Sequence, residues 1–306
     1  MRKIWILSSN TPDDVKCIKR DQLIPEHIPG GQYENIKLFD EFKNSNFDVS
    51  IMDPSKIKIR DHNLITFNDI NISLPDAALI RTTNGSSIST LQMLKKIGIR
   101  CINNIDAHLI CANKPKQLDI LNRNSVDIPK TWIMDIFFVE SDLDKLQFPI
   151  VVKPISSQRG EMVELCKTID DAYVHCKKIR MKYPNQNKVI FQEPIYGPTI
   201  VAWVVGRIPM DAQIRQPKSG IDFFISNRRE DGERKPYKIN AKLKTIITNA
   251  VNVLNIDIAK IDILKSSDGY KICEVNSPGG FSGRDDYFLG ANHARDIVSY
   301  MNRIIR

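Results

Sequence analysis

Short apolar runs and segments with helical spacing alternate along the first hundred residues. The apolar runs lie in residues 2–8, 47–53 and 77–83, and helical spacing covers Tyr33–Asn44 and Ser87–Ile97. Such alternation is typical of a parallel sheet covered by helices. Residues 1–105 are therefore predicted to form a small N-terminal α/β domain.

Two places in this domain are candidates for ligand contact. Residues 28–32 (Ile-Pro-Gly-Gly-Gln) form a predicted turn before the first helix, and Arg81 lies near the end of an apolar strand. Ligands of parallel sheets bind at the carboxyl ends of the strands, so Arg81 is a candidate substrate contact, with an ordinary turn as the alternative. No G-x-G-x-x-G follows the first strand, which argues against a dinucleotide site.

A polar loop lies between two apolar runs in the middle of the chain. Phe148–Pro154 predicts a buried strand carrying Lys153, and Met162–Cys166 predicts a second strand. The loop between them contains Ser157 and Gly160. It can close over phosphates through backbone N–H groups and hydroxyls, although most such loops are plain hairpin turns.

The next apolar run, Val189–Ile195, is interrupted at Pro194, which leaves backbone groups near its end for an adenine ring. Ile200–Val205 is expected to continue the same sheet. Helical patterns cover Ala241–Leu254 and, amphipathically, Ala291–Ile305.

A β-hairpin is predicted between those two helices. Two apolar runs, Ile258–Leu264 and Tyr270–Asn276, flank residues 267–269 (Ser-Asp-Gly), which suit a three-residue loop with glycine in the left-handed conformation. A loop of this length places Ser266 opposite Tyr270 and so sets the register of the two strands.

That register pairs Leu264 with Ile272 and Asp262 with Glu274, and it places Asn276 on the same face as the carboxylates. Carboxylates roughly 5 Å apart destabilise each other unless a positive charge lies between them. Two carboxylates and an amide oxygen suit Mg²⁺. The alternatives are a surface hairpin with solvated carboxylates, or a buried pair in which one carboxyl is protonated.

The composition is that of an ordinary soluble globular protein. The 306 residues are 42% hydrophobic and 26% charged, enough for about two domains. Forty-four Lys and Arg against 36 Asp and Glu give a net charge of +8, which favours anionic partners such as nucleotides or acidic peptides. Nucleic acid is not expected, because the densest basic run, residues 177–182, lacks interleaved aromatic residues.

The six cysteines include no C-x-x-C pair and indicate reduced, mostly buried thiols. The apolar run Ile4–Leu7 is too short for a signal peptide or a membrane span. We therefore expect a cytoplasmic protein without a membrane partner, and we allow for a homo-oligomer. The five histidines form no spaced motif, and no Walker loop is present.

Taken in order, several of these features resemble the ATP-grasp superfamily, nearest to the RimK-type glutamate ligases and further from glutathione synthetases. The residues that carry the resemblance are Lys114, Lys153, Gln192-Glu193-Pro194-Ile195, Asp262 and Glu274-Val275-Asn276 followed by Pro278-Gly279. The resemblance implies an ATP-grasp fold, α/β with α+β character in its C-terminal part. It implies an N-terminal domain at 1–105, a central lid subdomain at 106–188 and a C-terminal subdomain with the metal site at 189–306.

The resemblance also assigns roles to matching positions. The nucleotide-binding candidates are Lys114, Lys153, Gln192, Ser157, Gly160, the Glu193 carbonyl and the Ile195 N–H. The candidates for holding Mg²⁺ or Mn²⁺, with two ions expected, are Asp262, Glu274 and Asn276. The catalytic candidates are Arg215 and Asn276, and the substrate candidates are Arg81, Asn227, Arg228, Ser277, Gly279 and Arg284.

This chain departs from the family pattern in three places. Thr199-Ile200-Val201 stands where these ligases usually have Asp-Ile-Arg, and Ile225-Ser226-Asn227 stands for Arg-Ser-Asn, although Arg228 and Arg229 follow closely. The phosphate loop has one glycine, Gly160, where relatives often have more.

Enzymes of this kind activate a carboxylate with ATP to an acyl phosphate, which an amine then attacks to form an amide, ADP and phosphate. The resemblance therefore implies an ADP-forming carboxylate–amine ligase that adds glutamate or another amino acid to a peptide, protein or small-molecule amine. Two alternatives remain. One is a nucleotide-binding protein without ligase turnover, and the other is a ligase that forms lactams or esters in a ribosomal peptide.

Overall fold

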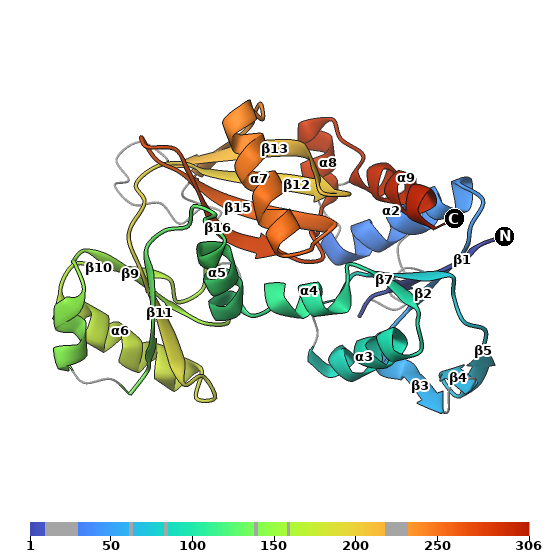
Figure 1. The fold of residues 1–306 in the computed structure, drawn as a ribbon, viewed down its shortest axis with the longest axis horizontal. Helices are drawn as coiled ribbons and strands as arrows, with labels where there is room; N and C mark the ends of the chain where they lie inside the picture. Colours follow the sequence, from blue (N-terminus) through green and yellow to red (C-terminus); the bar gives the residue numbers. More distant parts are fainter. Residues whose placement is uncertain are drawn as a thin grey trace.

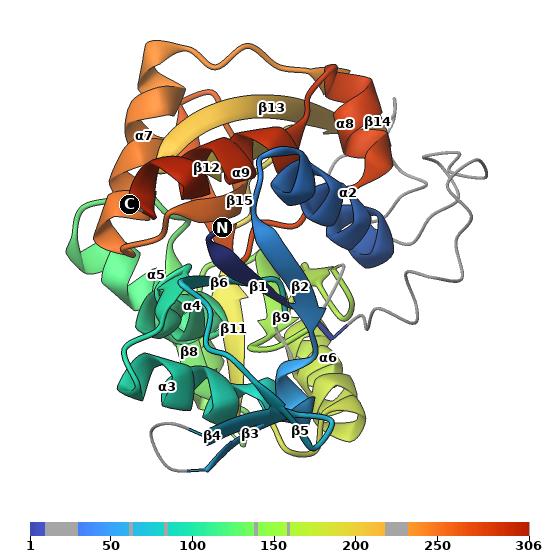
Figure 2. The same cartoon turned by 90° about the vertical axis from the view of Figure 1, so that its right-hand side faces the viewer.

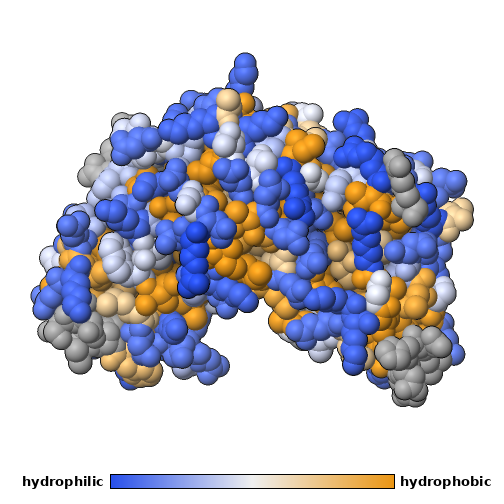
Figure 3. Space-filling model, in the orientation of Figure 1, coloured by the Kyte–Doolittle hydropathy of each residue, from blue (hydrophilic) through white to orange (hydrophobic). Residues whose placement is uncertain are grey.

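The computed structural model describes residues 1–9, 30–60, 64–82, 85–137, 140–157, 160–217 and 232–305. Within these residues, four sheets and the helices packed on them build an N-terminal domain, a lid and a C-terminal part (Figure 1). The lid and the N-terminal domain project on either side of α4 and α5, and the space-filling view is hollowed between them (Figure 3).

A four-stranded parallel sheet, in strand order β2-β1-β6-β7, forms the centre of the N-terminal domain. Its strands are β1 (Lys3–Leu7), β2 (Asp48–Met52), β6 (Ala77–Ile80) and β7 (Arg100–Ile102), and its helices are α2 (Gly30–Asn44) and α3 (Ile88–Lys96), which follows the short 3₁₀ turn η3 (Gly85–Ser87). The prediction of an open parallel sheet with helices is confirmed. The predicted turn at 28–32 is corrected in part, because α2 already begins at Gly30.

A small antiparallel sheet in the same domain was not predicted from the sequence. It consists of β3 (Ile57–Arg60), β4 (Leu64–Phe67) and β5 (Ile70–Ile72), after the 3₁₀ turn η2 (Pro54–Lys56). Asn68 and Asp69 join β4 to β5 with positive φ angles of 49° and 64°. An Asn-Asp pair between two short apolar runs is a hairpin signal that could have been recognised.

The lid is a four-stranded antiparallel sheet in the order β10-β9-β11-β8. Its elements are β8 (Thr131–Asp135), the 3₁₀ segment η4 (Glu140–Lys145), β9 (Ile150–Pro154), β10 (Glu164–Cys166), α6 (Ile169–Lys182) and β11 (Lys188–Gln192). Helix α6 begins with a capping box between Thr168 and Asp171 and packs its apolar side on the sheet in a separate core. The lid is thus an independently packed unit.

A five-stranded antiparallel sheet, in the order β14-β13-β12-β15-β16, forms the C-terminal part. Its strands are β12 (Thr199–Val205), β13 (Ile208–Pro217), β14 (Gly232–Pro236), β15 (Ile258–Lys265) and β16 (Tyr270–Asn276). One face shares a core with α4 (Ile105–Cys111), α5 (Lys114–Arg123) and α7 (Ala241–Val253). The other face meets α9 (His293–Ile304), which follows α8 (Gly283–Leu289).

The predicted boundaries 106 and 189 differ from this packing. Strand β11 pairs with β8 and β9, so the boundary before residue 189 falls inside the lid sheet, and β12 opens a new sheet instead of continuing the old one. Helices α4 and α5 pack on the C-terminal sheet although they lie in the predicted central subdomain. We propose residues 193–198 as the hinge between the lid and the C-terminal part.

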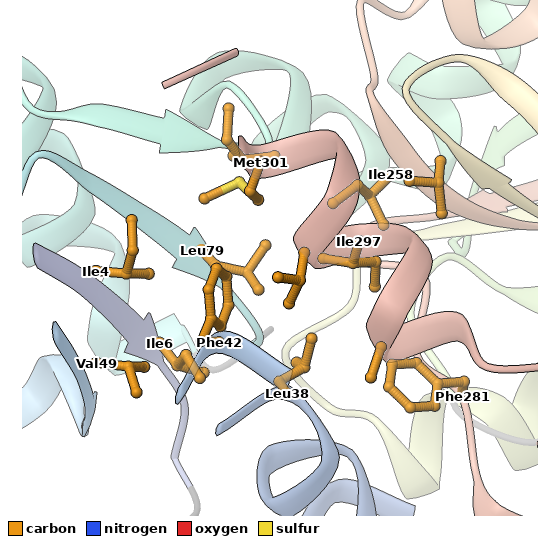
Figure 4. Close-up of a cluster of buried hydrophobic side chains, with 14 of the residues drawn as sticks. Ile4, Ile6, Leu38, Phe42, Val49, Leu79, Ile258, Phe281, Ile297 and Met301 are labelled. Carbon is orange, nitrogen blue, oxygen red and sulfur yellow. The ribbon is translucent and has the colours of Figure 1, made fainter. Parts of the chain in front are cut away.

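A large apolar core joins the N-terminal domain to the C-terminal sheet. Ile4, Phe42 and Leu79 meet Ile258 and Met301 in one cluster of buried side chains (Figure 4). Figure 2 shows α2 and β1 lying against the part of the chain that holds α9. Buried apolar contact of this extent keeps the two parts in one fixed arrangement.

Five cysteines are in the described residues, and all are free thiols, three of them buried. This agrees with the expectation of reduced thiols, and Cys17 lies outside the described residues. No helix in the described ranges is long and apolar enough to cross a membrane.

Candidate active site

In the hairpin β15–β16, Asp262 pairs with Glu274 as predicted, but the residues nearer the turn pair differently from the prediction. The loop is shorter than predicted, because Lys265 pairs with Tyr270 and the Ser266 N–H donates to the Gly269 carbonyl at 2.9 Å, which leaves only residues 267 and 268 between the bonded positions. The prediction that Leu264 faces Ile272 and Ser266 faces Tyr270 is therefore wrong. A β-bulge between the two regions restores the register at the carboxylates.

The extra residue of this bulge is Cys273. Without it, Ile272 and Glu274 would point to the same side of the strand, whereas here Ile272 is fully buried in the core and Glu274 faces the opposite side. The apolar positions Tyr270, Ile272 and Val275 already contain the signal, because their spacing changes from two to three. Burial raises the pKa of the Cys273 thiol, which lies close to both lysine and carboxylate charges.

Asp262, Glu274 and Asn276 form what we call the metal end of the hairpin. Asp262 is buried, its Oδ1 has no hydrogen-bond partner among the described residues, and its Oδ2 accepts from Asn276 Nδ2 at 3.4 Å. Burial raises the pKa of Glu274; Lys114 and Lys153 lower it, and Asp262 raises it further. A buried carboxylate oxygen without a donor beside a second carboxylate fits a divalent cation.

The described residues contain no group of three or more His, Cys, Asp and Glu side chains placed to hold a metal ion. The metal end supplies two carboxylates and one amide instead. This is the kind of small oxygen set that binds Mg²⁺ when water and phosphate oxygens complete the coordination.

Two lysines predicted to meet phosphates converge on this place. Lys114 Nζ lies 3.4 Å from Glu274 Oε1 and donates to the carbonyl oxygen of Ser157 at 3.3 Å, so helix α5, the hairpin and the loop after β9 meet at one ammonium. Lys153 Nζ donates to Gln192 Oε1 at 2.8 Å. Gly160, in the same loop, has a φ of +72°. The structure thus brings these predicted nucleotide contacts to one side of the metal end.

The hinge is fixed by a glutamate side chain. Glu193 Oε1 accepts from the Lys271 ammonium at 2.7 Å and from the Lys130 backbone N–H at 2.9 Å. Partial burial would raise the pKa of Glu193, but these two donors outweigh it and lower the pKa. Lys271 was not among the sequence candidates. The carboxylate ties the start of β8 and the end of β11 to β16, beside the predicted adenine-reading backbone of Glu193 and Ile195.

Paired residues on neighbouring antiparallel strands point to the same side of a sheet. Gln213, Val201, Asp262 and Glu274 therefore form one row across the C-terminal sheet. Arg215 is buried on the same face, two residues nearer the hinge along β13. This position agrees with the predicted role of Arg215 near the transferring phosphate.

The next row away from the hinge contains Asp211, Trp203, Lys260 and Asn276. The Lys260 ammonium lies 5.5 Å from the centre of the Trp203 ring. Neither Asp211 nor Lys260 was recognised from the sequence. Only the strand pairing reveals that they share a face with the metal end.

Residues 277–283, which we call the glycine segment, follow the metal end. Gly279 has a φ of +71°, and a Cβ there would lie 2.6 Å from the Ala259 carbonyl carbon, so only glycine fits. The Gly280 carbonyl accepts from Trp203 Nε1 at 3.2 Å. Gly279, a predicted substrate contact, packs directly on β15.

Two other predicted substrate residues are held by the protein itself. The buried Arg81 pairs with Glu34 and donates to the Pro278 carbonyl at 2.6 Å. Ser277 Oγ accepts from Asn103 Nδ2 at 2.8 Å and lies 2.9 Å from His108 Nδ1. Burial lowers the pKa of Arg81 to about 9 and that of His108 to about 4. The strand end that suggested a ligand site for Arg81 is covered by the glycine segment.

The remaining substrate candidates are scattered. Arg284 is exposed in the first turn of α8. Asn227 and Arg228 lie outside the described residues, as does Arg229.

At this site, two lysines and a loop of the phosphate-binding type lie beside the paired carboxylates, between the lid and the C-terminal antiparallel sheet. A RimK-like ATP-grasp domain model matches residues 111–301, which include all of these site residues. The chain belongs to the RimK-like ATP-grasp family. The prediction of an ATP-grasp fold of RimK type is thereby confirmed, and ATP-dependent ligation is the chemistry of this family.

Relatives agree with this assignment. A probable alpha-L-glutamate ligase of Thioalkalivibrio sulfidiphilus is 25% identical over 289 residues, which cover 90% of this chain and 93% of that protein. Beta-citrylglutamate synthase B of Danio rerio is 28% identical over 254 residues, covering 78% of this chain and 61% of the synthase. The ATP-grasp ligase PsnB, solved in complex with a minimal precursor, superposes with a TM-score of 0.71 over 100% of this chain and 99% of PsnB at 14% identity. This RimK-like protein therefore shares the ATP-grasp fold from end to end.

Proposed function

We propose that this RimK-like protein is an ADP-forming carboxylate–amine ligase that uses Mg–ATP. The observation that carries the proposal is the metal end. There a buried Asp262 oxygen, without a donor in the part of the chain that the structure describes, lies on the strand position paired with Glu274, and burial raises the pKa of Glu274. Lys114 completes the site at 3.4 Å from Glu274. Carboxylates brought together in this way favour the binding of a cation, and the adjoining lysines suit the phosphates that accompany it.

The proposed reaction has two steps. A substrate carboxylate oxygen attacks the γ-phosphorus of ATP, giving an acyl phosphate and ADP. An amine then attacks the acyl carbon, phosphate leaves and an amide forms. Mg²⁺, when bound, neutralises the phosphate charge during the transfer. Holding the two reactants together can supply roughly 7–11 kcal/mol of the barrier reduction.

The residues of this chain have separate tasks in that scheme. Asp262, Glu274 and Asn276 hold the cation, while Lys114 and Lys153 bind phosphate oxygens and orient the γ-phosphate. Arg215 stabilises negative charge on the transferring group, and donors so aimed are typically worth about 3–4 kcal/mol. The hinge backbone at Glu193 and Ile195 holds the adenine, oriented by the contacts of the Glu193 carboxylate with Lys130 and Lys271.

Glutamate is the first substrate to test. The names of the relatives point to glutamate ligation, and the net charge of +8 favours an acidic substrate. A second candidate keeps the ligase reaction but acts on a ribosomal peptide. It is motivated by Thr199 and Val201, which replace an acid and an arginine of the family pattern on the site face next to the hinge.

One assay separates these functions. The full chain is mixed with Mg–ATP and pools of amino acids, peptides and amines, and phosphate release and ligated mass are measured. The proposal predicts phosphate release that depends on substrate, together with a product heavier by one ligated residue. Tight Mg–ATP binding with no stimulated release in any pool would contradict it and support a binding protein without turnover.

A further inference from the structure

A lysine on the site face of the C-terminal sheet has no carboxylate of the described chain to neutralise it. Lys260 of β15 is half-buried and forms no ion pair with any described residue. Two other lysines of the site do have such partners. Lys114 Nζ lies 3.4 Å from Glu274 Oε1, and Lys271 Nζ lies 2.7 Å from Glu193 Oε1. The charge of Lys260 is therefore available to a ligand.

The Lys260 ammonium is held over an aromatic ring. It lies 5.5 Å from the centre of the Trp203 ring, which is buried. Trp203 Nε1 donates to the Gly280 carbonyl at 3.2 Å, so the glycine segment helps to fix the ring. An aromatic face attracts a cation through its quadrupole and supplies no net negative charge. The ammonium thus has a defined place and keeps its full charge.

Lys260 lies beside the metal end, on the side away from the hinge. It pairs with Asn276 and stands two residues before Asp262 on β15, so all three face the same side of the sheet. Two residues of a strand span about 7 Å. In Figure 1 the lid lies at one end of this sheet, and α8, α9 and α2 gather at the other. Along the face from the hinge, the metal end comes first and Lys260 next.

The proposed reaction brings its carboxylate substrate to this side. The two reacting groups, the carboxylate and the γ-phosphate, are both anions and repel each other. Attacking and leaving oxygens of a phosphoryl transfer lie roughly in line. Because ADP leaves toward the hinge, where the adenine is held, the carboxylate approaches from the opposite side, next to Lys260. A lysine is a point charge on a flexible stem and can offset the repulsion there.

We propose that Lys260 binds the carboxylate that receives the phosphoryl group. The inference rests on the proposed ligase function and adds a residue that selects the first substrate as an anion. One carboxylate oxygen attacks the γ-phosphorus, and the other accepts a charge-assisted hydrogen bond from the Lys260 ammonium.

The test measures the carboxylate and the nucleotide separately in Lys260→Met, which keeps an apolar stem and removes the charge. The full chain is given Mg–ATP, hydroxylamine and pools of amino acids and peptides. Hydroxylamine traps an acyl phosphate as a hydroxamate, which is quantified by mass, and the carboxylate that gives most hydroxamate is used for the KM. Lys260→Met should raise that KM by at least about tenfold. The Kd for Mg–ATP, measured by titration calorimetry, should stay at the wild-type value.

Lys265→Met is the matched control. Lys265 lies on the same strand, and its ammonium lies 5.4 Å from the centre of the Tyr237 ring, so both variants remove a cation held over an aromatic ring. Tyr237 packs with Ile261 and Ile263 in the core on the other face of the sheet. Lys265→Met should therefore change neither the KM nor the Kd. Lys260→Gln should show the same rise in KM as Lys260→Met, and Lys260→Arg, which keeps the charge, should recover most of it.

The failures are distinguishable. No hydroxamate from wild type in any pool would overturn the proposed function, and the role of Lys260 with it. Hydroxamate formed with the same KM in wild type and Lys260→Met would leave carboxylate activation standing and overturn the role of Lys260 alone. A weaker Kd for Mg–ATP with an unchanged KM would overturn it too and would assign Lys260 to a phosphate. A rise in KM that Lys260→Arg does not reverse would show that packing, and not charge, is responsible.

Discussion

The metal end and the glycine segment are adjacent in sequence but differ in how their polar groups are satisfied. At the metal end, Asp262 has a buried oxygen to which no described residue donates, and burial raises the pKa of Glu274. In the glycine segment, Ser277 has two internal polar contacts, the Pro278 carbonyl is held by Arg81, and Gly279 is packed on a backbone. The metal end has a buried polar atom that lacks a partner among the described residues, and a ligand can supply one. In the glycine segment, Ser277 and the Pro278 carbonyl already have partners within the protein.

This difference separates activity from stability. Removing a charge at the metal end should damage turnover and leave the fold intact, because that charge is a cost in the free protein. Removing a group of the glycine segment or its supports should lower the free energy of unfolding. The predictions below are ordered by their expected effect on that free energy.

Arg81→Met should have the largest effect on stability. It leaves the buried Glu34 carboxylate without its partner, and breaking a buried pair costs about 3–5 kcal/mol. Urea unfolding measures the loss. The double variant Glu34→Gln with Arg81→Met should recover part of it. A stable Arg81→Met protein with a raised KM for substrate would show instead that Arg81 is a substrate contact, as its strand-end position suggested.

Gly279→Ala should lower the free energy of unfolding by about 2–4 kcal/mol, because the new Cβ combines a positive φ with a backbone clash. Gly290→Ala is the matched control. Gly290 also has a positive φ, +63°, but open space around it, and its replacement should cost about 1 kcal/mol. Equal losses in the two variants, measured by urea unfolding, would mean that the contact with Ala259 contributes nothing.

Glu193→Gln should cost about 1 kcal/mol, because the carboxylate loses its charge-assisted bonds to Lys271 and Lys130. The pKa of Glu193 is lowered from an ordinary value of 4.5, so its contribution is complete above that pH and is lost as pH falls through the lowered pKa. Melting temperatures of wild type and variant should therefore converge at acidic pH. A gap that persists there would assign the effect to packing.

Glu274→Gln should have the smallest effect on stability, or raise it slightly. The pKa of Glu274 is raised from 4.5, so its ionisation destabilises the folded state progressively as pH rises from 4.5 through the raised pKa. The variant should lack that decline. Thermal melting between pH 4 and pH 8 would reveal it, and a variant that melts well below wild type at neutral pH would show that the carboxylate is structural.

Much of the fold could be predicted because local patterns and the tertiary structure agree. The alternating strands and helices gave the parallel domain, and the pairing of Asp262 with Glu274 survived an incorrect turn because the bulge at Cys273 compensated for it. The antiparallel β3–β5 sheet was missed, and the lid boundary was placed before β11, which pairs within the lid sheet. In both cases the decisive signal lay in short runs whose partners are set by tertiary packing.

Site residues could be predicted only where the order of motifs along the chain matches the family pattern. Lys114, Lys153 and the metal end follow the family pattern and do converge. Arg81 and Ser277 were interpreted as substrate contacts because their internal partners, Glu34 and His108, lie far away in sequence.

Asp211 and Lys260 were missed for the same reason. They lie on different strands, and the face that they share with the metal end emerges only when β12 pairs with β13 and with β15. Such residues become visible only through the fold.

The most direct test of the central claim measures ATP binding and substrate-stimulated phosphate release as a function of Mg²⁺ in wild type and Glu274→Gln. Asp268→Asn, an exposed carboxylate in the turn of the same hairpin, is the matched control. The metal end predicts that Mg²⁺ strengthens ATP binding in wild type and in Asp268→Asn but not in Glu274→Gln, whose turnover falls by at least about 10³-fold. Full turnover of Glu274→Gln with an unchanged Mg²⁺ dependence would contradict the assignment.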